Sequence, residues 1–292
     1  ASDTALVRAQ WREQAPQGPA IARIEMLGEG SRYAALHFSG WSPSGEPELH
    51  RLVADLPAVE STSLNYLVQR RVQPNDPQYG SQWHLADMNV ETAWNFSTGG
   101  FTATGQRIAV GIVDDGVQDN HPDLMQNLVV VLANAAQHGT QVAGVVGAKG
   151  NNGIGVSGVN WDVDLVCPAT VNNLSDVFTQ FQSCRTARTL FNQSGGTQGR
   201  LIVAVTASWG FPGVDCGFGE PMFDELGAAG VLVVTSGPND PTDIDVVPDY
   251  PATCPNANNI VVTSYGEQNE VPFAVGDNTV HLLAPGLDIL TT

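Results

Sequence analysis

The pattern of apolar residues predicts alternating strands and helices in the C-terminal part of the chain. Ile108–Val113 is a short apolar run rich in β-branched side chains, which is typical of a central strand covered on both faces. Similar runs predict strands at Leu128–Leu132, Val163–Val166, Leu201–Ser208 and Val231–Thr235, and helical spacing predicts helices starting near His138, over Leu174–Phe191, and from Phe223 to Ala229. This alternation predicts an α/β fold with a doubly wound, mostly parallel sheet flanked by helices.

Residues 1–71 are expected to form a small separate α+β domain, ahead of a second domain over residues 72–292. Alternating side chains predict strands at Ala20–Met26 and Tyr33–Phe38. Helical spacing predicts a helix over Glu46–Leu56, and Leu64–Val68 is predicted to be a third strand. The outline is therefore β-β-α-β, followed by a dibasic linker that ends at Arg71.

The chain is strongly acidic. It has 30 Asp and Glu against 12 Lys and Arg, which gives a formal net charge of −18. This balance argues against nucleic acid and against an anionic membrane surface as partners, and it suits a protein that binds cations or basic segments. No apolar run reaches the roughly 18 residues of a membrane span, and no export signal stands at Ala1. We expect any such signal to have been removed or never present.

The cysteines fall in the second half of the chain and lack the C-x-x-C spacing of zinc and redox sites. In an exported protein, four cysteines would be expected to form two disulfides, with three possible pairings. The alternative is a set of separate buried thiols. The residues are Cys167, Cys184, Cys216 and Cys254.

Two neighbouring segments offer the parts of a nucleophilic site. Asp114 follows the Ile108–Val113 strand, and open α/β folds place their chemistry at this edge of the sheet. His138 opens the next predicted helix. A serine hydroxyl becomes a useful nucleophile when a neutral imidazole takes its proton and a buried carboxylate orients that imidazole. Alone, each residue would be an ordinary strand-end Asp or helix-capping His, but together they predict an orienting carboxylate, Asp114, and a general base, His138.

The two segments closely resemble known catalytic motifs. R-I-A-V-G-I-V-D-D-G-V-Q-D-N-H-P-D-L and H-G-T-Q-V-A-G are similar to the first two catalytic blocks of the subtilases (peptidase family S8), and the first is more similar to the kexin branch than to subtilisin. Later segments continue the resemblance: D-Y-P-A-T-C, N-I-V-V-T-S-Y and V-H-L-L-A-P-G. As a whole, the resemblance covers the chain from about Val72 to the C-terminus. It implies a subtilisin-like fold and a secreted, extracellular serine endopeptidase that acts on protein and peptide substrates through an Asp-His-Ser triad.

The resemblance also implies residues that bind the substrate. A-S-W-G is similar to the edge against which subtilases pair the substrate backbone as an added strand. Asp115 matches the kexin-like acid that helps to hold a basic residue just upstream of the scissile bond. The acids that make kexins select basic side chains after A-S-W-G are replaced by F-P-G, so strict dibasic specificity is not expected. The implied strand residues are Ser208, Trp209 and Gly210.

Asn239 is the implied donor to the oxyanion, a role worth about 3 kcal/mol in the barrier. Pro238 and Pro241 stand where the family has glycines, and proline fixes φ and lacks an N–H. The family's catalytic serine lies in a G-T-S segment shortly after A-P-G, but no G-T-S occurs here. We therefore expect the nucleophile outside this chain. The alternative is a truncated or degenerate subtilase domain that binds peptides or a partner without cleaving them.

A Ca²⁺ site is also implied by the resemblance. Hard oxygen ligands drawn from separate loops suit calcium better than a transition metal. The implied ligands are the side chains of Asp76, Asp123 and Asn152 and the backbone carbonyls of Lys149, Ile154 and Val156.

The N-terminal segments Y-A-A-L-H-F-S-G, P-E-L-H-R-L-V-A-D-L-P and V-E-S-T-S-L-N-Y-L-V-Q are similar to the later half of a subtilase propeptide, of the inhibitor-I9 type. Such propeptides assist folding and block the active site. Residues 1–71 are accordingly expected to act as an intramolecular inhibitor in a zymogen, with self-cleavage after Arg71. The alternatives are an unrelated N-terminal domain and a simple solvated basic linker.

Overall fold

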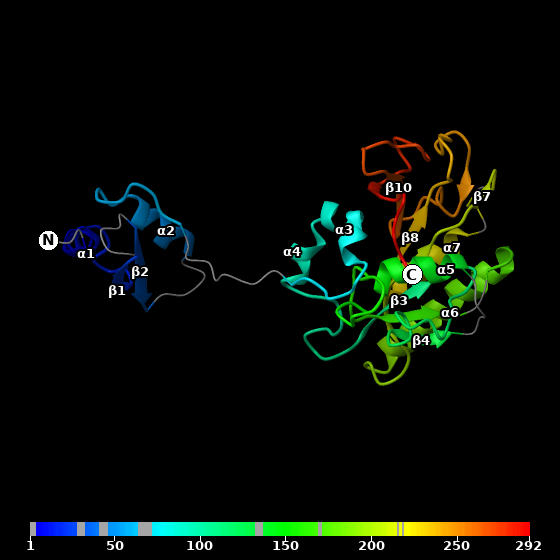
Figure 1. Cartoon of the computed structure of the whole chain (residues 1–292), viewed down its shortest axis with the longest axis horizontal. Coiled ribbons are helices and arrows are strands. Elements are labelled where there is room, and N and C mark those ends of the chain that lie inside the picture. The colour runs from blue at the N-terminus through cyan, green and yellow to red at the C-terminus, as the bar shows by residue number, and fades with distance from the viewer. Residues whose placement is uncertain are drawn as a thin grey trace. The chain divides into compact units, whose positions relative to one another are not determined.

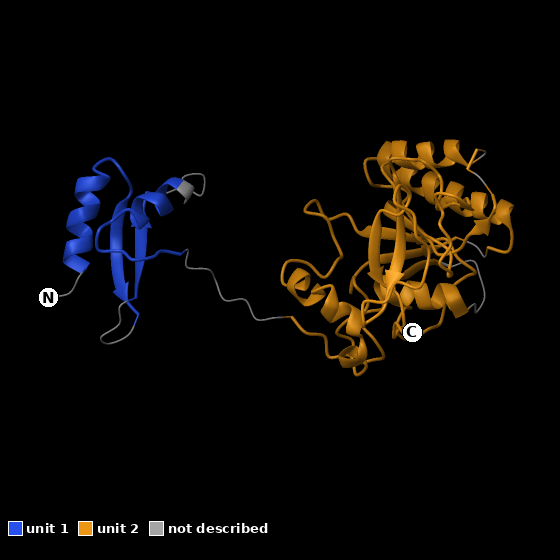
Figure 2. Cartoon of the chain, turned by 90° about the horizontal axis from the view of Figure 1, so that it is seen from above, with its two compact units in different colours: residues 1–69 blue, residues 70–292 orange. Residues whose placement is uncertain are grey.

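The structure of the protein is a computed structural model. It describes residues 4–27, 33–40, 46–63, 72–131, 137–168, 171–214, 216–217 and 219–292. The chain divides into two compact units, residues 1–69 and residues 70–292, each coloured separately in Figure 2. The predicted strand Leu64–Val68 lies outside the described residues.

The first unit is a two-stranded antiparallel sheet with two helices. Strands β1 (Ala20–Met26) and β2 (Ala34–Ser39) pair with each other, and helix α2 spans Glu46–Ala54, as the sequence predicts within two residues at each end. Helix α1 (Thr4–Gln14) is not predicted from the apolar pattern, because Trp11 is its single buried residue. Trp11 packs against Phe38, with ring centroids 5.1 Å apart.

The second unit is built on a seven-stranded sheet in the order β11-β10-β8-β6-β3-β5-β4, in which every pair is parallel. Its strands are β3 (Ile108–Ile112), β4 (Leu128–Val131), β5 (Asp164–Cys167), β6 (Leu201–Ala207), β8 (Leu232–Ser236), β10 (Asn259–Tyr265) and β11 (Leu282–Pro285). The predicted α/β, mostly parallel sheet is confirmed.

Helices and short elements surround the sheet (Figure 1). The long helices are α5 (Gln137–Gly147), α6 (Leu174–Gln193) and α7 (Glu220–Ala229). The short elements are the 3₁₀ turn η2 (Tyr79–Ser81), α3 (Trp83–Asp87), α4 (Val90–Trp94), and the antiparallel pair β7 (Phe211–Pro212) and β9 (Asp249–Tyr250). Within the described ranges, no helix has the length and apolarity that crossing a bilayer requires.

The central strand β3 is buried on both faces, which explains its continuous apolar run. Ala109 and Val113 pack in a core shared with α6 and α7. Ile112 faces the opposite way, into a core shared with Ala143 of α5. Helices therefore cover both faces of the sheet and fix the ends of β3, where Asp114 follows.

One disulfide, rather than the expected two, is present among the described cysteines. Cys216 is bonded to Cys254, while Cys167 and Cys184 are buried thiols. Side chains alternate along β5, so Val166 shares the α6 core with Cys184, whereas Cys167 belongs to the α5 core on the other face. The sheet thus separates the two thiols. Burial raises the pKa of Cys184 to about 12, which keeps it protonated and unreactive.

Candidate active site

The predicted residues of the site follow strands that end at one edge of the sheet. Asp114 comes two residues after β3, Ser208 comes directly after β6, and Asn239 comes three residues after β8. These three strands are consecutive neighbours in the parallel sheet, so their carboxyl ends share an edge. Helix α5 carries His138 in its first turn. The topology therefore brings together segments that lie far apart in the sequence.

Asp114 and His138 are in direct contact. The distance from His138 Nδ1 to Asp114 Oδ1 is 2.7 Å. The Asp114 side chain is 4% exposed, whereas the His138 side chain is 54% exposed. A buried carboxylate that accepts from Nδ1 fixes the tautomer in which Nε2 is free to accept a proton. No described residue hydrogen-bonds to Nε2, so the ring presents that nitrogen to a reacting group.

The backbone around Asp114 is held from two sides. Its carbonyl oxygen accepts from Val171 N–H at 2.9 Å and from the buried Gln180 side chain of α6 at 3.3 Å. The Trp209 indole donates to the carbonyl of Val113 at 2.7 Å. These bonds tie the end of β3 to α6 and to the segment after β6. Gln180 was missed from the sequence, although a glutamine within an apolar helix face is a signal for a buried polar contact.

A glycine lets helix α5 approach the strand end. A Cβ at Gly139 would overlap the carbonyl oxygen of Gly116 and crowd Asp114. Gly139 N–H instead donates to Asp115 Oδ1 at 2.7 Å, which places an acid at the positive end of the helix. Asp115 therefore has a structural contact, while its other oxygen accepts no hydrogen bond from the described residues.

Ligand atoms of Asp114, Asp115 and His138 all lie within 4.8 Å of one another, a set of donor types that could hold a metal ion. Two hydrogen bonds to these carboxylates favour the orientation of His138 over the binding of a metal ion. The Asp114 oxygen that meets His138 also accepts from Asp115 N–H at 2.8 Å, and one Asp115 oxygen accepts from Gly139. The group is best described as an oriented imidazole with its carboxylate.

The contact between Asp114 and His138 affects the pKa of His138. The hydrogen bond to Asp114 raises the pKa of His138, burial opposes the rise, and the charges of Asp114 and Asp115 add to it. Activity that needs the neutral imidazole is therefore expected to fall as pH drops through a value above the ordinary histidine pKa. Histidine NMR titration of the native protein measures this value directly. In Asp114→Asn the His138 pKa is expected to drop, and an unchanged pKa would contradict the pairing.

The segment implied to bind substrate leads directly into β7. Trp209 is fixed by its bond to Val113, and Gly210 is exposed. Asn239 is exposed as well, in a loop whose Pro238 carbonyl accepts from Ala274 N–H at 3.3 Å. The structure thus places Asn239 at the same sheet edge. Its role at the oxyanion stays a prediction, as do the roles of Ser208–Gly210.

The C-terminal residues lie against α5, where Figure 1 also shows the C-terminus. The hydroxyl of Thr291 donates to the carbonyl of Gln141 at 2.8 Å, and that of Thr292 donates to the carbonyl of Thr140 at 3.1 Å. Both acceptors are within one turn of His138. The segment after β11 therefore returns to the helix that carries the candidate general base.

Two carboxylates converge on the loop that follows α5. Asp76 accepts from the backbone N–H groups of Asn151 at 2.7 Å and Asn152 at 3.0 Å. Asp123 accepts from Val156 N–H and from the Asn152 side chain, each at 2.9 Å. Burial raises the pKa of Asp123, and the nearby charge of Asp76 raises it further. The predicted metal-site segments are therefore adjacent in space.

The carbonyls of this loop suit a hard cation. Among the described residues, no hydrogen bond reaches the carbonyl oxygens of Lys149, Ile154 or Val156, although Val156 is only 1% exposed. The Lys149 ammonium pairs with Asp162 instead of with Asp76 or Asp123. Two buried carboxylates and three carbonyls without a donor therefore fit a calcium ion, whose preferred ligands are such oxygens.

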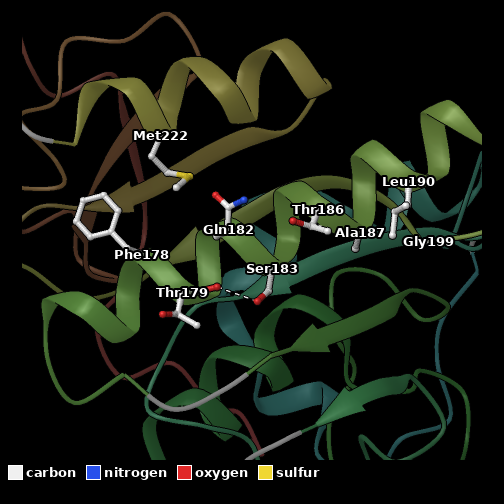
Figure 3. A pocket seen from close by; sticks show the side chains of 9 residues that line it. All are labelled: Phe178, Thr179, Gln182, Ser183, Thr186, Ala187, Leu190, Gly199 and Met222. Carbon is white, nitrogen blue, oxygen red and sulfur yellow. Dashed lines mark hydrogen bonds between the residues drawn. The ribbon is translucent and has the colours of Figure 1, made fainter.

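One cavity lies apart from this centre, and one predicted site residue is not among the described residues. Arg71, the predicted processing residue, is outside the described residues. A cavity of about 690 Å³ opens on α6, and its nine lining residues are uncharged: they belong to α6, apart from Gly199 and from Met222 of α7 (Figure 3). Asp114 and His138 are not among them. This cavity therefore offers no group for acid–base chemistry.

Comparison with known proteins identifies the family of this chain. The family model described as "Subtilase family" matches residues 105–292. The extracellular basic protease of Dichelobacter nodosus is 26% identical over 286 residues, covering 82% of this chain and 46% of that protein. Furin of Rattus norvegicus is 36% identical over 112 residues, covering 31% of this chain and 14% of furin. The chain spans less than half the length of these curated relatives.

Solved structures give the same result. A protease from Pseudoalteromonas arctica has a TM-score of 0.58 and 25% identity, covering 74% of this chain and 73% of that one. The epidermin leader peptide processing serine protease of Staphylococcus aureus has a TM-score of 0.54 and 15% identity, covering 98% of this chain and 73% of that one, and supports the fold alone. With more than half of its residues matched by the family model, this chain belongs to the subtilase family.

Proposed function

We propose that this chain carries the orienting carboxylate and the general base of a secreted serine endopeptidase, which hydrolyses peptide bonds through an Asp-His-Ser triad. The observation that carries the proposal is the 2.7 Å contact between a buried Asp114 and a half-exposed His138, whose Nε2 has no hydrogen bond to any described residue. A binding module has no need of this arrangement. The extracellular relative supports secretion of this protein.

In the proposed reaction, His138 Nε2 accepts the proton of a serine hydroxyl as that oxygen attacks the substrate carbonyl. Asp114 stabilises the imidazolium that results, and His138 then gives the proton to the leaving amine. The backbone of Ser208–Gly210 pairs with the substrate, and the Asn239 amide donates to the oxyanion. Because these 292 residues contain no G-T-S segment, we propose that the serine belongs to a further part of the protein.

The same proposal includes a Ca²⁺ ion that holds the loop after α5. Asp76, Asp123 and Asn152 would bind it through side chains, with the carbonyls of Lys149, Ile154 and Val156. The ion supplies charge compensation and rigidity. The buried carboxylates and the carbonyls without donors support this ligand set.

Residues 1–71 are proposed to inhibit the enzyme until the chain is cut after Arg71. The product of the complete gene is therefore expected to hydrolyse peptide substrates and to convert itself to a form that begins at Val72. Peptide hydrolysis with N-terminal sequencing measures both, and an Arg71→Ala variant is expected to stay uncut. A mature N-terminus far from Val72 would contradict the proposed cleavage after Arg71. Absence of any hydrolysis would contradict the proposed peptidase activity.

The second candidate function is a non-cleaving module that binds peptides along the Trp209 edge. Pro238 and Pro241 on either side of Asn239 favour it, because they stiffen the loop expected to hold the oxyanion donor. Peptide binding without hydrolysis by the complete gene product would support this candidate over the enzyme.

A further inference from the structure

Gln180 is a buried amide whose hydrogen-bonding capacity is only partly used. It lies on the buried face of helix α6 and is 0% exposed. Its Nε2 donates to the carbonyl oxygen of Asp114 at 3.3 Å. Its Oε1 is fully covered and accepts no hydrogen bond from the residues that the structure describes. The other buried residues of this helix belong to the apolar core: Val177, Phe181 and Cys184.

The energetic balance of a glutamine at this position is unfavourable. One amide hydrogen bond contributes less to stability than an unsatisfied buried oxygen costs. A methionine has a similar length and no strongly polar atom, so it would fill the same space without that cost. A residue that is poor for stability and yet contacts the candidate site indicates a functional role.

The contact acts on the peptide unit that joins Asp114 to Asp115. The carbonyl of this unit accepts from Gln180 and also from Val171 N–H, the latter at 2.9 Å. Its N–H, which belongs to Asp115, donates to Asp114 Oδ1 at 2.8 Å. Because a peptide unit is planar and rigid, the donors that fix its carbonyl also fix the direction of its N–H.

The carboxylate oxygen that accepts this N–H is the one that contacts the imidazole. Asp114 Oδ1 lies 2.7 Å from His138 Nδ1. The other oxygen, Oδ2, is fully covered and accepts no hydrogen bond within the described part of the chain. The orientation of the carboxylate therefore depends on the Asp115 N–H. Hydrogen bonds in series polarise one another, so a donor at the carbonyl also strengthens the bond from this N–H.

We propose that Gln180 is a positioning residue: it fixes the peptide unit between Asp114 and Asp115, which in turn orients the Asp114 carboxylate toward His138. The effect on rate rests on the proposed peptidase function, whereas the effect on His138 can be measured in this chain. Gln180 acts through Asp114, so its loss is expected to weaken the catalytic pair without abolishing it.

Gln180→Met in the 292-residue chain tests the positioning. NMR titration, with the His138 signal assigned by its loss in His138→Ala, is expected to give a lower His138 pKa than in the wild type. The reason is that the bond to Asp114, which raises this pKa, is weakened, while the charges of Asp114 and Asp115 are retained. The Nδ1 proton of the imidazolium is expected to resonate further upfield.

The stability of the same variant separates positioning from a purely structural role. The Tm of Gln180→Met is expected to equal or exceed that of the wild type, because the variant buries no unsatisfied oxygen. A role in folding alone would instead lower the Tm and leave the His138 pKa unchanged.

The complete gene product tests the effect on rate. With a chromogenic peptide, kcat is expected to fall about 10-fold in Gln180→Met and KM to stay within about twofold, because a displaced catalytic group slows the reaction without weakening substrate binding. Gln180→Leu is a second variant with the same expectations, in case methionine is not tolerated.

Gln182→Met is the matched control. Gln182 is on the same helix but lines the α6 cavity (Figure 3), so the wild-type pKa, Tm and kcat are expected. An unchanged His138 pKa in both Gln180 variants, or an unchanged kcat in an active protein, would overturn the proposal. Absence of hydrolysis by the wild type would contradict the peptidase function alone, and the NMR titration would still decide whether Gln180 orients the pair.

Discussion

Replacement of His138 by alanine is expected to lower kcat by about 10⁶-fold in the complete protein, and Asp114→Asn by about 10⁴-fold. His138→Ala removes the proton acceptor itself. Asp114→Asn keeps the shape of the side chain but removes the charge that stabilises the imidazolium and selects its tautomer. Progress curves with a chromogenic peptide, together with active-site titration of the wild type, measure both effects.

The folded state should survive His138→Ala. The His138 side chain is 54% exposed, so its removal leaves little unfilled core and is expected to change stability by less than about 0.5 kcal/mol. Asp119→Asn, which alters an exposed acid within the first motif, is the matched control for Asp114→Asn and should retain full activity. Wild-type rates in His138→Ala would show that the imidazole is not the general base.

Removal of calcium is expected to have the second large effect. An ion at about 1,000 times its dissociation constant stabilises the folded state by about 4 kcal/mol, which for a unit of this size is roughly 10 °C in Tm. Without the ion, Asp76 and Asp123 remain buried beside each other with no cation. Calorimetric scans in calcium and then in excess chelator measure the difference.

Asp123→Asn is expected to abolish the response to calcium, because it removes one of the two buried charges. For each variant, the Tm in calcium is compared with the Tm of the same variant in chelator. A hydrogen bond lost through the substitution lowers both values and therefore does not affect their difference. Asp119→Asn is the control, and its Tm should still fall on chelation. A wild-type Tm that is the same in calcium and in chelator would contradict the calcium site.

The sheet could be predicted from the sequence because its strands are buried on both faces. Ile108–Val113 has no polar interruption, since its alternate residues face the two cores on either side of the sheet. Helix α7 begins at Glu220, earlier than the apolar pattern indicates, because no side chain of this helix before Phe223 is buried. Helix α1 was missed for a related reason, since Trp11 is its single buried residue.

The candidate site, like the fold, was predicted from the sequence only in part. Asp114 and His138 could be identified because each stands in a contiguous motif next to a predictable element. Gln180 was not identified, because its hydrogen bond to the carbonyl of Asp114 joins two segments that lie far apart in the sequence. The disulfide expectation was wrong for Cys167 and Cys184 because spacing does not reveal which face of the sheet a thiol occupies.

Labelling of the complete gene product with a fluorophosphonate tests the central claim most directly, because the probe reacts with a serine that a general base has activated. The account predicts that one serine is labelled in the wild type, that this serine is in a G-T-S segment, and that His138→Ala is not labelled. Labelling that persists unchanged in His138→Ala, or a wild-type protein that never reacts, would contradict the claim that Asp114 and His138 activate a nucleophile.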